Sequence, residues 1–224
     1  MKRKYLKSIL ISIVVFSILI GGSVFFKKNQ KTPNEFKDYI QTIEGWNIYK
    51  NEKFGYIIQY PQDWTIIKTQ ENHGIVLSNV TFQSNNYEEK TNPQPQTVEG
   101  LWRTQLLTKG TTLIFNIVRI PPDPNWCIGL FEDNPQECTW HYWAKRGTDW
   151  PYGKILNQEF ITLNGREVYK KEIEYQNITS IVISFSDLEE KTLFEFIIDT
   201  LTKDKERNLE LLEQIISNSK FLKS

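Results

Sequence analysis

The chain has 224 residues, with 27 basic and 27 acidic side chains, and 13% of its residues are aromatic. Its first 26 residues carry four basic side chains and no acidic one, which leaves 23 basic against 27 acidic side chains in the remainder. A mildly acidic domain has no electrostatic attraction for nucleic acid or for an anionic membrane surface, so we expect neither as a ligand.

The N-terminus predicts a membrane anchor. Basic residues within positions 1–7 precede an uncharged run over positions 8–26, and Lys27 and Lys28 close that run. A helix over this run is about 30 Å long, which matches the hydrocarbon core of a bilayer. We therefore expect a cytoplasmic tail, a single transmembrane helix, and a remainder on the extracytoplasmic side of the cell membrane.

The alternative is a signal peptide that is cleaved near Ser23, with Gly21 and Ser23 as the small residues before the cut. The apolar residues Val24–Phe26 and the lysines after them favour retention. The first cysteine is Cys127, so the chain has no bacterial lipoprotein signal.

Residues 27–44 predict a polar linker with Pro33, followed by a short helix from Glu35 to Ile43. The polar segment 84–97 is expected to be the least ordered part of the domain. Short runs rich in β-branched and aromatic residues predict the next elements, which are strands. Those strands are expected at 46–49, 56–60, 64–68, 74–82 and 111–120.

The C-terminal part predicts a hairpin, two further strands and a helix. Asn164-Gly165 is the residue pair that tolerates positive φ at both turn positions, and it separates strands expected at 159–163 and 167–175. Asp204 is positioned to cap a helix that ends near Ser217 and carries Leu209, Leu212 and Ile216 on one face. The two further strands are expected at 180–185 and 193–198. These elements predict an α+β domain, an antiparallel β-sheet flanked by helices.

The segment Asn51–Trp64, with the sequence NEKFGYIIQYPQDW, resembles the opening hairpin of PsbP-like domains, in which a Gly-aromatic strand runs into Tyr-Pro-x-x-Trp. The Asn164-Gly165 hairpin and the closing segment 211–222 are similar to the C-terminal half of that family. The resemblance implies an α/β/α sandwich at 45–223, in a bacterial, membrane-anchored relative of the photosystem II extrinsic protein. It implies a lumenal or extracytoplasmic location and does not indicate an activity.

The chain departs from this pattern in an insertion at 121–153, which holds its two cysteines, Cys127 and Cys138. On the oxidising side of a membrane these cysteines favour a disulfide, which would contribute about 3 kcal/mol by closing a short loop. The alternative is a Zn²⁺ site made by the two cysteines and His141, with Asp133 or Glu137 as the fourth ligand. We expect the disulfide, and no metal or other cofactor.

The insertion is also rich in aromatic residues. These either order the loop by packing internally or form a surface for sugars, cations or a protein. The candidate binding surface consists of Trp126, Trp140, Tyr142, Trp143, Trp150 and Tyr152. Acidic residues among them are candidate hydrogen-bond acceptors, although their spacing matches no calcium loop: Asp123, Glu132, Asp133, Glu137 and Asp149.

The sequence contains no nucleophile elbow, no His-Glu-x-x-His, no phosphate-binding glycine loop and no dinucleotide fingerprint. We therefore expect a non-catalytic binding or assembly module whose partner is an envelope protein or a cell-wall glycan. The competing interpretation is an extracytoplasmic enzyme that uses His141 with Cys138 or nearby acids, with or without zinc.

Overall fold

The structure is a computed structural model that describes residues 43–92, 105–120, 140–147, 153–187 and 191–221. The chain divides into a unit of residues 1–42 and a unit of residues 43–224, and the described residues all belong to the second unit. The expected tail and anchor lie outside the described residues, as does the expected linker and helix segment except for Ile43 and Glu44. Among the residues that are described, no helix is both long enough and apolar enough to cross a membrane.

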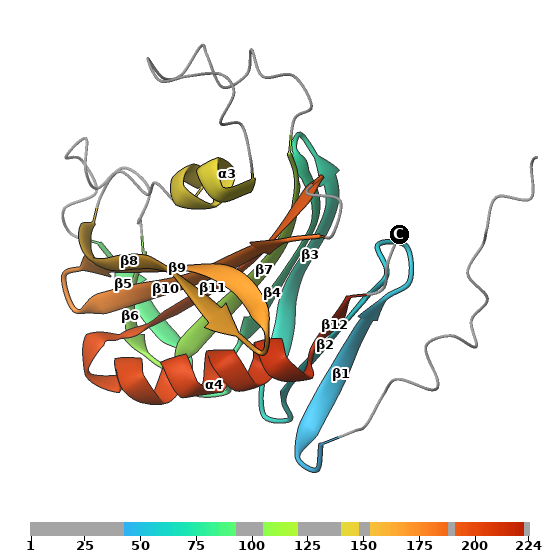
Figure 1. The fold of residues 1–224 in the computed structure, drawn as a ribbon. Coiled ribbons are helices and arrows are strands. Elements are labelled where there is room, and N and C mark those ends of the chain that lie inside the picture. The colour runs from blue at the N-terminus through green and yellow to red at the C-terminus, as the bar shows by residue number, and fades with distance from the viewer. Residues whose placement is uncertain (1–42, 93–104, 121–139, 148–152, 188–190, 222–224) are drawn as a thin grey trace, which may run out of the picture. The chain divides into compact units, whose positions relative to one another are not determined.

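Seven antiparallel strands form the main sheet, in the order β3-β4-β7-β11-β10-β9-β8 (Figure 1). The bounds of these strands are Thr65–His73 (β3), Val76–Gln83 (β4), Thr111–Arg119 (β7), Lys154–Leu163 (β8), Arg166–Tyr175 (β9), Ile178–Ser186 (β10) and Thr192–Leu201 (β11).

Two smaller sheets and two helices complete the described fold. The strands Trp46–Asn51 (β1), Tyr56–Pro61 (β2) and Lys220–Phe221 (β12) form a three-stranded sheet. The strands Glu88–Thr91 (β5) and Gln105–Lys109 (β6) form a two-stranded sheet. The helices are Trp140–Gly147 (α3) and Lys205–Asn218 (α4), and a single 3-10 turn, Thr202–Asp204, precedes α4.

The predicted Asn164-Gly165 turn is confirmed. Asn164 has a φ of 53° and Gly165 a φ of 75°, so both residues adopt the left-handed conformation that a two-residue hairpin requires. The turn joins β8 to β9, and Leu163 pairs directly with Arg166.

Helix α4 covers one face of the main sheet and also contacts β2. Leu212 and Ile216 are buried and Leu209 is partly buried, as the spacing of these residues predicts. The expected cap is only half right. Asp204 is the residue before the helix, but its side chain makes no capping hydrogen bond; instead the Asn208 amide donates to the Asp204 backbone carbonyl at 3.1 Å.

The predicted arrangement of helices is confirmed only in part. Helix α4 shares its side of the main sheet with the three-stranded sheet, since residues of β2 and α4 belong to one core, and the eight-residue α3 packs on the other side (Figure 1). The described domain is therefore mostly antiparallel β-sheet with few helices, rather than a sheet between two helical layers.

The prediction of little order at 84–97 is wrong for its central part. Residues Glu88–Thr91 form β5 and pair with β6, and Lys109 makes an ion pair with Glu88 at 2.8 Å. Leu106 and Leu107 of β6 are buried. The polar sequence of β5 gives no strand signal because its partner strand supplies the apolar contacts.

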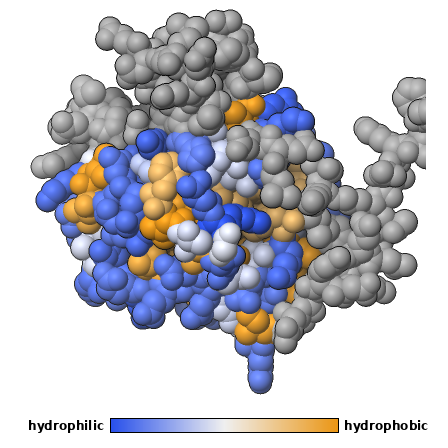
Figure 2. Space-filling view, in the orientation of Figure 1, coloured by the Kyte–Doolittle hydropathy of each residue, from blue (hydrophilic) through white to orange (hydrophobic). Residues whose placement is uncertain are grey.

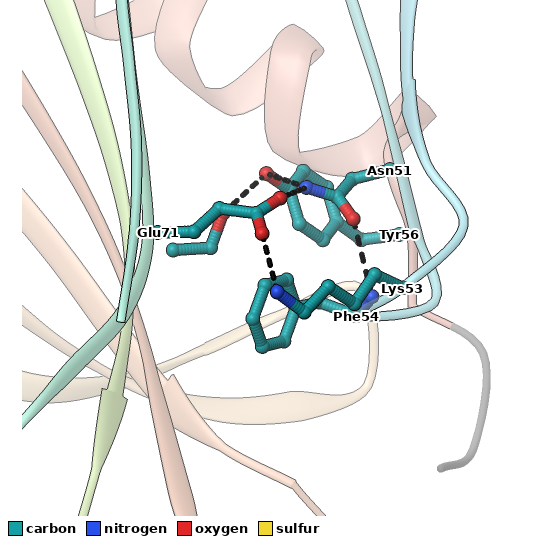
Figure 3. A network of polar contacts seen from close by, with 6 residues as sticks. Asn51, Lys53, Phe54, Tyr56 and Glu71 are labelled. Atoms are coloured by element: carbon teal, nitrogen blue, oxygen red, sulfur yellow. Dashed lines mark hydrogen bonds and ion pairs between the residues drawn. The ribbon is translucent and has the colours of Figure 1, made fainter. Parts of the chain in front are cut away.

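Polar contacts attach the β1–β2 hairpin to the main sheet (Figure 3). Lys53 makes an ion pair with Glu71 of β3 at 2.6 Å, and the Asn51 amide donates to the same carboxylate at 3.3 Å. The hydrogen bond from Lys53 lowers the pKa of Glu71. The hydroxyl of Tyr56 lies 2.9 Å from that of Ser78 on β4, and burial raises the pKa of Tyr56. These contacts hold the hairpin beside β3 and β4.

Candidate functional site

A row of polar side chains crosses the centre of the main sheet. Asn79 on β4 is opposite Asn116 on β7, Asn116 is opposite Glu195 on β11, and Glu195 is opposite Ser184 on β10. Residues directly opposite one another in adjacent antiparallel strands point to the same face of the sheet. The four side chains therefore share one face.

This face is the one on which helix α3 packs. Val118 and Leu193 lie two residues along their strands from Asn116 and Glu195, and both belong to a buried cluster with Trp140 and Ala144 of α3. The alternate residues of the same strands point into the core under α4. We call the four residues Asn79, Asn116, Glu195 and Ser184 the polar row.

Hydrogen bonds connect three members of the polar row. The Asn79 Nδ2 donates to Asn116 Oδ1 at 2.6 Å, and the Asn116 Nδ2 donates to Glu195 Oε2 at 3.5 Å. Within the described ranges, three buried side-chain atoms have no hydrogen-bond partner: Asn79 Oδ1, Ser184 Oγ and Trp143 Nε1. Two belong to the polar row and the third to α3, which packs on the same face. Because native proteins leave few buried polar atoms unpaired, this face is the strongest candidate for a functional site.

Glu195 has unusual electrostatics. The residue is 5% exposed, and burial raises the pKa of its carboxyl from the ordinary 4.5 to about 7, while the hydrogen bond from Asn116 acts in the opposite direction. At 3.5 Å this bond is long for an N–H···O contact and offsets little of the desolvation. A carboxyl with this pKa exchanges a proton near neutral pH, which is the property expected of a functional group.

His141 lies near the edge strand β8. Its Nε2 is 2.8 Å from Glu167 Oε2, and its ring stacks on Trp140 at 4.1 Å and meets Phe160 of β8 at 5.0 Å. Both members of the His141–Glu167 pair are about half exposed, so it contributes little to stability. Cys138, the other residue of the enzyme interpretation, lies outside the described residues.

The candidate binding surface is described at two of its six positions. Trp140 is 5% exposed and packs against the sheet, and Trp143 is partly buried against the same cluster. At these positions the aromatic rings contribute internal packing. The other members lie outside the described part, as do both cysteines of the expected disulfide: Trp126, Trp150, Tyr152, the Tyr142 side chain, Cys127 and Cys138.

Replacing Trp140 with Ala is expected to lower the free energy of unfolding by about 2 kcal/mol. This is less than the usual cost of truncating a buried aromatic residue, because a short helix can detach and limit the loss. Chemical denaturation of the full chain measures the change, and His141→Ala, at a half-exposed neighbouring position, should cost clearly less. Equal losses for the two variants would contradict the burial of Trp140.

The described residues contain no group of three or more His, Cys, Asp or Glu side chains placed to hold a metal ion. The residues of the zinc alternative other than His141 lie in the insertion, outside the described ranges.

Sequence reasoning missed the polar row, although a signal was present. Alternation along the strand Leu193–Ile198 places Phe194, Phe196 and Ile198 on one face, which leaves Glu195 on the other. That second face also carries Ile197, which is buried, and Asn116 interrupts a β-branched strand in the same way. A polar residue on an otherwise apolar second face indicates a sheet that is covered on both sides.

Comparisons with known proteins extend to the fold alone. No protein-family model and no curated protein matches the chain. Among solved structures, it is similar to cyanobacterial PsbP (CyanoP) from Synechocystis, with a TM-score of 0.48 and 13% identity over 81% of this chain and 95% of that chain. PsbP is also the family that the sequence resemblance names, but a likeness of this size carries no argument about family membership or a membrane anchor.

Two further structures are similar to the chain at lower TM-scores. A crystal structure from Bacteroides thetaiotaomicron has a TM-score of 0.40 and 11% identity, over 75% of this chain and 46% of that chain. The Ran-binding protein Mog1p of Saccharomyces cerevisiae has a TM-score of 0.44 and 8% identity, over 79% of this chain and 95% of that chain. Likenesses this weak carry no argument about function, which must come from the chain's own residues.

Proposed function

We propose that the chain is a single-pass, membrane-anchored module that binds an envelope protein on the extracytoplasmic side, through the outer edge of strand β8. The basic, apolar and basic pattern of residues 2–28 supports the anchor. The observation that carries the binding role is the exposed aliphatic pair Ile155 and Leu156 on β8.

Strand β8 is the last strand in the order of the main sheet, so only β9 pairs with it among the described strands. Residues 154–159 are all exposed, with Ile155 at 45% and Leu156 at 39%. An edge strand of this kind presents backbone groups that pair with an added strand, and its apolar side chains supply contact area. The partner that fits is therefore an extended protein segment.

The opposite edge strand, β3, is similar in composition, but one of its side chains contacts the β1–β2 hairpin. Strand β3 carries Ile66 and Ile67, which are 38% and 51% exposed, and its Glu71 holds the β1–β2 hairpin through Lys53 and Asn51. Figure 2 shows small hydrophobic patches on a mainly hydrophilic face, and the exposed large aliphatic residues are few: Ile66, Ile67, Ile75, Ile155 and Leu156. Two of these five lie on β8.

Replacing Ile155 and Leu156 together with Asp is expected to reduce capture of the partner at least about tenfold. Burial of one aliphatic side chain is worth about 1.5–3 kcal/mol, and the added charges oppose burial further. The measurement is in-cell crosslinking followed by affinity isolation of the full-length chain from membranes, with captured protein quantified against wild type.

The matched control is the Ile66→Asp, Ile67→Asp variant, which makes the same change at the opposite edge. Equal loss in both variants, or no loss in the β8 variant, would contradict the proposal.

Co-sedimentation with isolated cell walls distinguishes a glycan ligand, which would bind with similar affinity whether or not β8 is altered. Intact mass reports on the anchor, since a soluble chain that begins after Ser23 would contradict its retention.

A further inference from the structure

The hydrogen-bond chain through the polar row has a direction. Asn79 donates to Asn116, and Asn116 donates to Glu195, so the carboxylate is the final acceptor. This direction requires an ionised carboxylate, or at least an acceptor oxygen, at Oε2. It also leaves Asn79 Oδ1 as a buried acceptor without a partner among the described residues.

Protonation of Glu195 changes what its carboxyl can do. A protonated carboxyl has an O–H, and the amide group facing it can present its oxygen instead of its nitrogen by turning about its last side-chain bond. Asn116 Oδ1 then accepts from Glu195, and Asn116 Nδ2 points toward Asn79. For that second contact to remain a hydrogen bond, Asn79 must turn as well and present Oδ1.

We propose that Glu195, Asn116 and Asn79 form a proton-binding hydrogen-bond chain in which uptake of one proton from solvent by Glu195 reverses both amide hydrogen bonds. The unpaired atom of Asn79 then changes from an acceptor oxygen to a donor nitrogen. A proton bound on β11 thereby changes the unpaired atom of Asn79 on β4, two strands away, without a change in backbone register.

The surroundings of Glu195 are compatible with proton binding near neutral pH. Burial and the Asn116 hydrogen bond set the pKa of Glu195, and no charged side chain in the described part of the chain contributes. The charged or titratable side chains on this side of the sheet around β11 are Asp199 on β11, Glu167, Tyr169, Lys171 and Tyr175 on β9, Tyr87 just before β5, Lys109 on β6, and His141 and Lys145 on α3.

Several of these neighbours have partners of their own. The hydroxyl of Ser180 donates to Asp199, Glu167 contacts His141, Tyr169 donates to Gln158, and Lys109 contacts Glu88. The Lys145 ammonium lies 5.5 Å from the centre of the Phe160 ring. Strands β7 and β10 contribute no charged side chain to this face, and α4 packs on the opposite face.

The test is a pH titration of the full-length chain by NMR, with labelled Glu carboxyls and Asn side-chain amides, between about pH 5.5 and pH 8.5. The carboxyl of Glu195 is expected to titrate near pH 7, and the amide signals of Asn116 and Asn79 should shift with the same midpoint. The control is Asn208, whose amide donates to Thr200 and to the Asp204 carbonyl and should not follow that midpoint.

The Glu195→Gln variant separates the proposal from a general effect of pH. A Gln amide donates as the protonated carboxyl does, so Asn79 and Asn116 should show the low-pH signals of wild type at every pH. Amide signals of Asn79 that stay constant while Glu195 titrates would overturn the reversal. A Glu195 carboxyl that stays ionised over the whole pH range would overturn the proton site itself. Neither outcome depends on β8, so the proposed function stands or fails separately.

Discussion

At about pH 8.5 the Glu195→Gln variant is expected to be about 3 kcal/mol more stable than wild type. Above pH 7 the wild-type protein holds a buried, ionised carboxylate whose only described hydrogen bond is the 3.5 Å contact from Asn116. A pKa raised from 4.5 to about 7 corresponds to that free energy. Gln keeps the shape of the side chain and never ionises.

The sign of the pH dependence follows from proton binding. Between about pH 4.5 and pH 7 the folded protein retains a proton on Glu195 that the unfolded chain releases. The stabilisation that this proton gives the folded state is therefore fully present below pH 4.5 and is lost as the pH rises through 7. Denaturant unfolding of the full chain at several pH values should show this decline in wild type and its absence in the Gln variant.

Glu172→Gln is the matched control. Burial pushes the pKa of Glu172 up, but hydrogen bonds from Lys170 and Lys205 lower it overall. Loss of the Glu172 carboxylate should lower the free energy of unfolding near neutral pH. The fall in stability with rising pH that Glu195 causes should remain. A Glu195→Gln variant that keeps the wild-type slope would refute the raised pKa.

Replacing Phe115 with Ala is expected to lower the free energy of unfolding by about 4 kcal/mol. Phe115 is fully buried on β7, and its ring centre lies 4.9 Å from that of Tyr56, 4.6 Å from that of Phe196 and 6.0 Å from that of Phe221. Those neighbours belong to β2, β11 and β12, so the cavity would open where the three-stranded sheet meets the main sheet.

Two further variants calibrate this loss in the same denaturant unfolding measurement. Phe115→Leu, which keeps much of the side-chain volume, should cost about 1 kcal/mol. Phe160→Ala, at a partly exposed position on the edge strand, should cost less than Phe115→Ala. A loss at Phe115 no larger than that at Phe160 would contradict its place at the junction of the sheets.

Sequence patterns predicted the elements that depend only on residues close together in the chain. The Asn164-Gly165 turn follows from two residues that tolerate positive φ, and α4 follows from apolar residues spaced on one face. The strand order could not be predicted in this way. The pairing of β7 with both β4 and β11 depends on segments far apart in the chain. The polar strand β5 was missed because its partner, β6, supplies the apolar residues.

The candidate site was hidden for a similar reason. The alternation around Glu195 predicts which face it shares, but its burial depends on remote strands and on the far side of the sheet being covered. Trp140 gives the complementary case. Its position in an aromatic segment was compatible with packing or with binding, and only its contacts with Val118 and Leu193 show that this ring is internal.

The pairing of β12 with β2 has a consequence for the order of folding. Lys220 and Phe221 pair with Ile57 and Tyr56, about 160 residues earlier in the chain. Closing so long a loop is entropically costly, and folding slows as contacts become more distant in sequence. Strand β12 therefore cannot pair with β2 until nearly all of the domain has been synthesised. During that time β2 has an unpaired edge.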